Sequence, residues 1–163
     1  MSMIKLLRTI WRTGRVAEPA GPPPAMPSCP KAAALRGSVQ LRHVDAGSCN
    51  GCEIEIGSAF GPVYDAERHG ARLVASPRHA DALLVTGPVT RNMVEPLRRT
   101  FEALSEPRIV VAVGDCARDG GEFAAGYGVE GPVGDVVPVD LEIPGCPPAP
   151  EAIVAALRSL TGR

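Results

Sequence analysis

The chain has 163 residues, 45% of them hydrophobic and 4% aromatic, with a formal net charge of −1. This length lets one domain bury a single core without disulfides, and the near-neutral charge argues against nucleic-acid binding. No secretory leader and no run of about 18 apolar residues is recognisable, so neither export nor a membrane span is predicted. Cysteines in such a chain are expected in metal ligation or redox chemistry rather than in disulfides.

Residues 1–37 are predicted to form an N-terminal extension. At about 100° per residue, the apolar and basic side chains of residues 3–15 fall on opposite sides of a helix, and residues 18–30 carry six prolines, which is typical of a linker. We expect this amphipathic segment to dock onto a membrane surface or a hydrophobic partner subunit; the alternative is a helix folded onto its own domain. The apolar side consists of Met3, Ile4, Leu6, Leu7, Ile10 and Trp11, and the basic side of Lys5, Arg8, Arg12 and Arg15.

Residues 38–163 are predicted to form an α/β domain. Strand and helix patterns alternate along this part of the chain, which favours a mostly parallel sheet covered by helices. The continuous apolar run at residues 108–113 is typical of a strand buried on both faces. The predicted strands are residues 39–44, 72–75, 82–86, 108–113 and 136–139, and the predicted helices are residues 54–60, 93–104 and 149–160.

Four of the cysteines each follow a predicted strand. Cys49 and Cys52 follow residues 39–44, Cys116 follows residues 108–113, and Cys146 follows residues 136–139. Since ligands of open α/β sheets bind outside the carboxyl ends of the strands, we expect these thiols to meet at one edge.

Four thiolates can bind either a [4Fe–4S] cluster or a tetrahedral zinc ion. Structural zinc sites usually pair two Cys-x-x-Cys motifs, whereas here Cys116 and Cys146 come singly from distant loops, which favours a cluster. Four unrelated buried thiols are the remaining alternative. Cys29 lies in the proline-rich stretch, where no strand presents it, and is interpreted as a non-ligand.

Four segments, in this order, resemble the respiratory complex I 20 kDa subunit family, which includes the small subunits of membrane-bound [NiFe] hydrogenases. The resemblance implies a flavodoxin-like α/β fold that carries one [4Fe–4S] cluster on Cys49, Cys52, Cys116 and Cys146. It also implies packing against a large hydrogenase-like or quinone-site subunit. The segments are residues 45–56, residues 76–90, residues 114–117 with Gly120 and Gly121, and residues 138–140 with residues 144–148.

The first cysteine motif, Cys-Asn-Gly-Cys, is similar to the hydrogenase branch of that family, because the complex I branch has adjacent cysteines there. The resemblance thus implies an electron-transfer subunit, not catalytic alone, of a formate hydrogenlyase or energy-converting hydrogenase type of oxidoreductase. Its partners would be the large subunit, a ferredoxin-like iron–sulfur subunit and membrane subunits, with the chain peripheral on the cytoplasmic side. The alternatives are a complex I-type subunit whose cluster reduces quinone and, in another class, a zinc-stabilised interaction module.

A few further residues carry weaker predictions. Glu55 matches an acidic position that the family links to proton movement, so it is a candidate proton relay, with a solvent-exposed surface role as the alternative. His79 is interpreted as a structural histidine rather than a redox-coupled one, and Asp81 as a residue that positions its loop. The sequence Gly126-x-Gly128-x-x-Gly131 follows no predicted strand and opens no helix, so we interpret it as a loop rather than a dinucleotide-binding turn.

Overall fold

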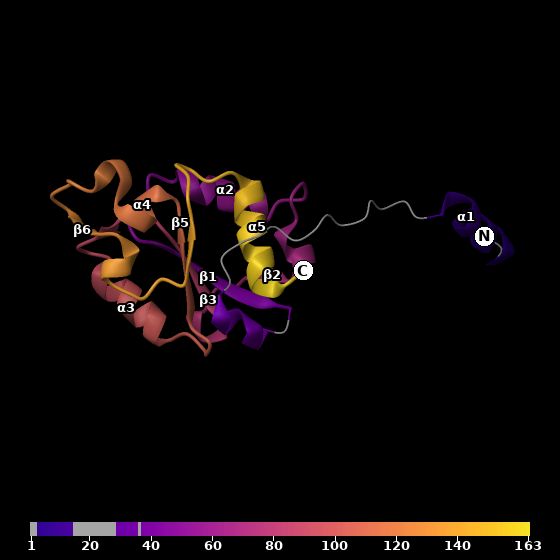
Figure 1. Ribbon diagram of the computed structural model, residues 1–163, viewed down its shortest axis with the longest axis horizontal. Helices are drawn as coiled ribbons and strands as arrows, with labels where there is room; N and C mark the ends of the chain where they lie inside the picture. Colours follow the sequence, from indigo (N-terminus) through magenta and orange to yellow (C-terminus); the bar gives the residue numbers. More distant parts are fainter. Residues whose placement is uncertain (1–2, 15–28, 36) are drawn as a thin grey trace.

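The computed structural model describes residues 3–14, 29–35 and 37–163. Within them, five strands form a sheet in the order β2-β1-β3-β5-β7, with every neighbouring pair parallel (Figure 1). Counted along the chain, this order is 2-1-3-4-5, which is the flavodoxin-like arrangement. The predicted α/β class and parallel sheet are confirmed. The strands are β1 (Val39–Asp45), β2 (Ala71–Leu73), β3 (Ala82–Thr86), β5 (Ile109–Val113) and β7 (Leu141–Ile143).

The central strands are apolar throughout because both faces of the sheet are covered. In β5, Ile109, Val111 and Val113 point into one core, while Val110 and Ala112 point into the other. Helices α2 (Gly51–Ala59) and α5 (Pro150–Thr161) contribute to the first core, and α3 (Val94–Glu102) and α4 (Asp115–Asp119) contribute to the second. Burial on both sides explains why period-2 alternation is missing from these strands.

Short elements complete the domain. Strands β4 (Val89–Thr90) and β6 (Val129–Gly131) pair antiparallel in a small separate ladder. The 3₁₀ helices are η1 (Pro30–Leu35), η2 (Ala66–His69), η3 (Pro77–His79), η4 (Gly121–Phe123) and η5 (Val133–Asp135).

Two sequence interpretations need correction. The predicted strand at residues 136–139 is wrong, because these residues follow η5 in irregular structure and the strand is β7, further along the chain. Val136, Val137 and Val139 nevertheless pack against the second core, which accounts for their apolar character. The glycine-rich segment at residues 126–131 is not wholly a loop, since its end forms β6, but no α-helix follows directly, so it is not a dinucleotide-binding turn.

The N-terminal segment contains two distinct parts. Helix α1 (Met3–Thr13) buries none of its residues, so the structure gives no support to the alternative of a helix packed onto its own domain. Residues 18–28 of the predicted proline-rich linker, which spans residues 18–30, lie outside the described residues. In η1, by contrast, Leu35 is buried and Lys31 Nζ contacts the Asp140 carboxylate at 2.8 Å. We therefore propose that the packed domain starts near residue 29 rather than at residue 38.

None of the helices in the described part of the chain has the length and apolar content needed to cross a bilayer.

Candidate four-thiol site

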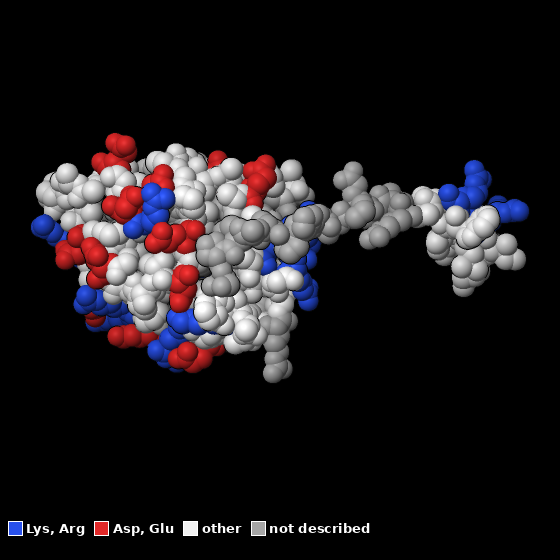
Figure 2. Space-filling view, viewed as in Figure 1, with Lys and Arg blue, Asp and Glu red and all other residues white. Residues whose placement is uncertain are grey.

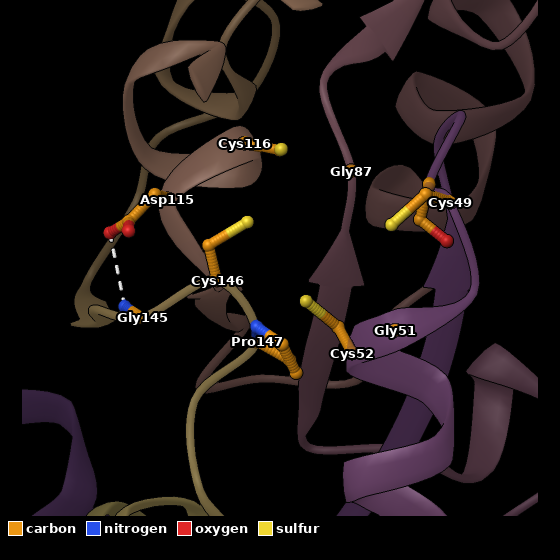
Figure 3. Close-up of a pocket in the computed structure, with 10 residues that line it drawn as sticks. Cys49, Gly51, Cys52, Gly87, Asp115, Cys116, Gly145, Cys146 and Pro147 are labelled. Carbon is orange, nitrogen blue, oxygen red and sulfur yellow. Dashed lines mark hydrogen bonds between the residues drawn. The ribbon is translucent and has the colours of Figure 1, made fainter. Parts of the chain in front are cut away.

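The four predicted cysteines lie at the carboxyl edge of the sheet. Figure 3 shows their sulfur atoms directed toward a common space, Cys49 and Cys52 on one side and Cys116 and Cys146 on the other. All four line one cavity of about 110 Å³, together with Ser48, Gly51, Gly87, Asp115, Gly145 and Pro147. The expectation that loops after separate parallel strands bring these thiols together is thus confirmed as geometry. The strand before Cys146 is β7 rather than the predicted one.

Helix α2 starts within the Cys-x-x-Cys motif. Asn50 has the left-handed conformation, with φ of 73°, and turns the chain so that the helix begins at Gly51. The predicted helix at residues 54–60 therefore starts too late. Cys52 lies in the first turn, where free backbone N–H groups and the helix dipole favour negative charge. This placement favours an anionic group bound at Cys52, although burial and nearby negative charges dominate the pKa of the free thiol.

Hydrogen bonds between neighbours of the cysteines hold the site together in pairs. The Ser48 hydroxyl donates to the Glu53 carboxylate at 2.6 Å, which ties the residue before Cys49 to the residue after Cys52. On the other side, the Asp115 carboxylate accepts from the Gly145 amide at 3.0 Å (Figure 3). Each pair of thiols is therefore positioned by a contact one residue away.

Glu53 also anchors α2 to the sheet. Its second carboxylate oxygen accepts a short hydrogen bond from the Thr86 hydroxyl, at the end of β3, and Thr86 is fully buried. His43 Nε2 lies 2.9 Å from the same hydroxyl oxygen and 3.5 Å from Glu53. The distances fit a chain in which the imidazole N–H donates to Thr86 and Thr86 donates to Glu53. These polar side chains connect the half-buried His43 to Ser48, which lines the cavity.

Two glycines permit the loops to approach so closely. Gly114 has φ of 89°, and a Cβ on it would lie 2.6 Å from Cys52 Sγ. Gly87 has φ of 75°, and a Cβ there would clash with the backbone of Ser48. Any other residue would therefore be strained and would fill space beside the thiols.

The thiols are electrostatically coupled. Burial, with the negative charges of Glu53 and of the other thiolates, raises the pKa of Cys52 to about 12. The pKa of Cys116 is also raised, mainly by burial and then by Cys146 and Cys49. The raised pKa values keep these cysteines protonated while no positive charge is nearby. Binding of a cation would displace the protons, because thiols bind metals as thiolates.

Four thiol side chains around one cavity are donors that suit a soft metal centre. Within residues 3–14, 29–35 and 37–163, no three His, Cys, Asp or Glu side chains meet closely enough to hold a single metal ion. The thiols instead surround a cavity of about 110 Å³, whereas roughly 10–15 Å³ suffices for one water. Four soft thiolate donors around such a space are the ligand set of iron–sulfur clusters.

The remaining candidate residues lie elsewhere. Glu55 is half-buried on α2, and its side chain makes no hydrogen bond among the described residues. His79 is exposed in η3, before the amino end of β3, and therefore lies at the opposite edge of the sheet from the cavity. Its side chain makes no hydrogen bond to the described residues, so the interpretation of His79 as a structural, hydrogen-bonding histidine was wrong. The Asp81 carboxylate accepts a hydrogen bond from the backbone N–H of Gln40 at 2.8 Å, which confirms that Asp81 positions its loop against β1. Cys29 is buried in the first core and does not line the four-thiol cavity.

Sequence reasoning missed Glu53, Thr86 and His43. The two acids on α2 are only two residues apart, and spacing alone does not say which one turns toward the sheet. The hydroxyl groups of Ser48 and Thr86 could have indicated a hydrogen-bonded acid near the cysteines, because both residues lie near the carboxyl ends of strands beside the site.

The parallel sheet, with four thiols gathered around one cavity at its carboxyl edge, defines an α/β protein whose candidate site lies between the segments that follow its strands. Residues 49–160 match the family described as NADH ubiquinone oxidoreductase, 20 Kd subunit. The chain belongs to this family.

Three proteins illustrate the similarity. The chain is 52% identical, over 112 residues, to the probable membrane-bound hydrogenase subunit mbhJ of Pyrococcus furiosus, covering 69% of this chain and 67% of that protein. It is 48% identical, over 118 residues, to formate hydrogenlyase subunit 7 of Escherichia coli, covering 72% of this chain but only 46% of that protein. Among solved structures, a chain of the archaeal membrane-bound sulfane sulfur reductase superposes with a TM-score of 0.69 at 32% identity, covering 80% of this chain and 72% of that one.

Proposed function

We propose that the chain is an electron-transfer subunit that carries one [4Fe–4S] cluster on Cys49, Cys52, Cys116 and Cys146. The observation that carries this proposal is the convergence of four thiols, from three separate loops, on one cavity. Membership of the 20 kDa subunit family supports it. Cys116 and Cys146 come singly from segments far apart in the sequence, which favours a cluster over a zinc site built from two Cys-x-x-Cys pairs.

A bound cluster supplies one-electron transfer, and the protein supplies the surroundings. The four thiolates hold it, and the start of α2 places positive potential next to Cys52. The hydrogen-bonded pairs Ser48–Glu53 and Asp115–Gly145 keep the loops in position. Substrate chemistry takes place in a partner, so the isolated chain has no catalytic activity. Glu55 remains a candidate proton relay toward that partner.

We further propose that the chain works in a hydrogenase-like, membrane-associated oxidoreductase complex. Its relatives in Pyrococcus furiosus and Escherichia coli are named as subunits of a membrane-bound hydrogenase and of formate hydrogenlyase. The proposed partners are a large hydrogenase-like subunit, a ferredoxin-like iron–sulfur subunit and membrane subunits. The chain would lie peripherally on the cytoplasmic side.

A complex I-type role in quinone reduction is the second candidate, because the family is described by a ubiquinone oxidoreductase. The split Cys49-x-x-Cys52 motif favours the hydrogenase type. The sequence of the proposed large-subunit partner would separate the two, since nickel ligation requires two Cys-x-x-Cys pairs there.

Metal and sulfide analysis of anaerobically purified protein tests the cluster. We expect about four iron and four acid-labile sulfide per chain, and an electron paramagnetic resonance signal on reduction with dithionite. Zinc without sulfide would overturn the proposal and establish the zinc-stabilised interaction module instead.

A further inference from the structure

Helix α1 exposes a continuous apolar side. Trp11 is 87% exposed, and Ile4, Met3, Leu7 and Ile10 are each at least 58% exposed. Single exposed apolar residues are common on protein surfaces, but a group that covers one side of a helix marks an interaction site.

The other side of α1 is cationic. Within Met3–Thr13 the charged residues are Lys5, Arg8 and Arg12, and no acid is present. Figure 2 shows Lys and Arg on α1 without Asp or Glu, whereas both kinds are interspersed on the visible face of the domain. The hydroxyls of Thr9 and Thr13 donate to carbonyl oxygens one turn earlier, so they need no external acceptor. The outward polar groups of the helix are therefore its three cations.

This combination identifies the class of partner. A second copy of the helix packed on the apolar side would leave the three cations of each copy on the outer side without negative partners, so it would account for only half of the surface. An anionic lipid surface offers negative headgroups beside an apolar layer, and amphipathic helices with basic polar faces lie in that boundary. At 1.5 Å per residue, the 11 residues of α1 extend about 16 Å, well short of the roughly 30 Å hydrocarbon core. The helix can thus lie in the plane of the bilayer surface but cannot cross it. Trp11 suits the interface because its indole is both apolar and a hydrogen-bond donor.

We propose that α1 is a lipid-binding helix that inserts its apolar side into the surface of an anionic bilayer. Lys5, Arg8 and Arg12 then contact the lipid phosphates. The helix would attach the subunit directly to the membrane, in addition to any contact through partner subunits. This attachment does not depend on the four-thiol site, so it can fail or hold independently of the proposed electron transfer.

Trp11 provides a direct probe, because it is the single tryptophan of the chain. The full-length protein, purified anaerobically, is mixed with vesicles of phosphatidylcholine alone or with added phosphatidylglycerol. We expect a blue shift of Trp11 emission and quenching by brominated acyl chains only with the anionic vesicles. Added salt should weaken binding, since the charges lie near the surface. No shift with either vesicle would overturn the proposal.

Matched variants separate the apolar and the charged contributions. Leu7→Glu, on the apolar side, should abolish the shift, whereas Val63→Glu, at an 80% exposed position of the domain, should leave it unchanged. Arg8→Glu should weaken binding to anionic vesicles about tenfold or more, while Arg98→Glu, exposed on α3, should not. Equal binding to both kinds of vesicle would refute the proposal that α1 is specific for anionic lipid. A loss of binding in Val63→Glu and Arg98→Glu as large as in the α1 variants would refute it as well.

Discussion

The Asp115 carboxylate accepts the Gly145 amide hydrogen at 3.0 Å, and the Asp115 amide donates to the Gly145 carbonyl oxygen at 2.9 Å. These reciprocal bonds join the residue before Cys116 to the residue before Cys146, although Cys116 lies in α4 after β5 and Cys146 lies in the loop after β7. The second pair of thiols is therefore positioned by a contact that involves neither sulfur.

Replacing Asp115 tests this contact. In Asp115→Ala, the Gly145 amide loses its acceptor, and because this bond is only partly buried the expected cost is about 1 kcal/mol. We expect a lower denaturation midpoint and reduced iron content after anaerobic purification. Glu122→Ala is the control, because Glu122 is exposed on η4 and makes no hydrogen bond among the described residues. Equal iron content in Asp115→Ala and the control would show that the loops are held without this contact.

Glu53 and Glu55 are expected to differ sharply although both lie on α2. In Glu53→Gln, the new NH₂ group faces the hydroxyl of Ser48 or Thr86, which must change from donor to acceptor, and both charge-assisted bonds to the carboxylate become weaker neutral ones. The expected loss of stability is about 1–3 kcal/mol. Glu55→Gln should change the free energy of unfolding by less than about 0.5 kcal/mol, because Glu55 makes no hydrogen bond to the described residues. Chemical denaturation of both variants measures the difference; similar losses would mean that Glu53 does not anchor the helix.

The strands and the convergence of the thiols could be predicted from the sequence, but part of the site could not. Predicted strands at residues 39–44, 82–86 and 108–113 agree with the structure to within a residue, because burial on both faces demands continuous apolar runs. Strand β7 was missed because it is short and its middle residue, Glu142, is exposed, while the more apolar valines before it are buried without a ladder. The hydrogen bonds of Glu53 were missed because they depend on the start of α2, which local propensity does not fix.

Gly114 is expected to tolerate no side chain. In Gly114→Ala, a methyl group would lie 2.6 Å from Cys52 Sγ, at a backbone φ of 89° that strains an alanine. We expect a severe loss of bound iron. Gly134→Ala is the matched control, since a Cβ there meets nothing within 4 Å and the backbone φ is not in the left-handed region. Normal iron content in Gly114→Ala would indicate that the loops can separate without harm to the site.

The cysteines themselves give the sharpest contrast. Cys116→Ser removes a thiol that lines the cavity, so iron and sulfide should fall to a small fraction of the wild-type content. Cys29→Ser should retain the full content, because Cys29 packs in the core on η1 and α5. A cost in stability is nevertheless expected for this change, as a polar hydroxyl replaces a buried thiol. Comparable iron loss in both variants would make Cys29 a ligand.

The environment of His43 predicts a pH dependence. Burial lowers its pKa below the ordinary 6.5 more strongly than the carboxylates of Glu53 and Asp45 raise it, and Arg42 lowers it further. The folded protein therefore binds fewer protons at His43 than the unfolded chain does, so this contribution to stability is present above the ordinary pKa of 6.5 and is lost as the pH falls from there through the lower pKa of the folded state. His69 changes the pH dependence of the stability in the same direction, because its pKa is also lowered, mainly by burial.

Titration of the histidine ring resonances by NMR measures these values, with His43→Gln and His69→Gln assigning the signals. Since the Glu53 carboxylate raises the pKa of His43, Glu53→Gln should shift it further down while leaving His69 unchanged. The coupling between the two side chains predicts this direction because a nearby negative charge stabilises the imidazolium form. A rise of the His43 pKa in Glu53→Gln would contradict the assigned contact. An unshifted value would show that the two groups are not coupled in solution.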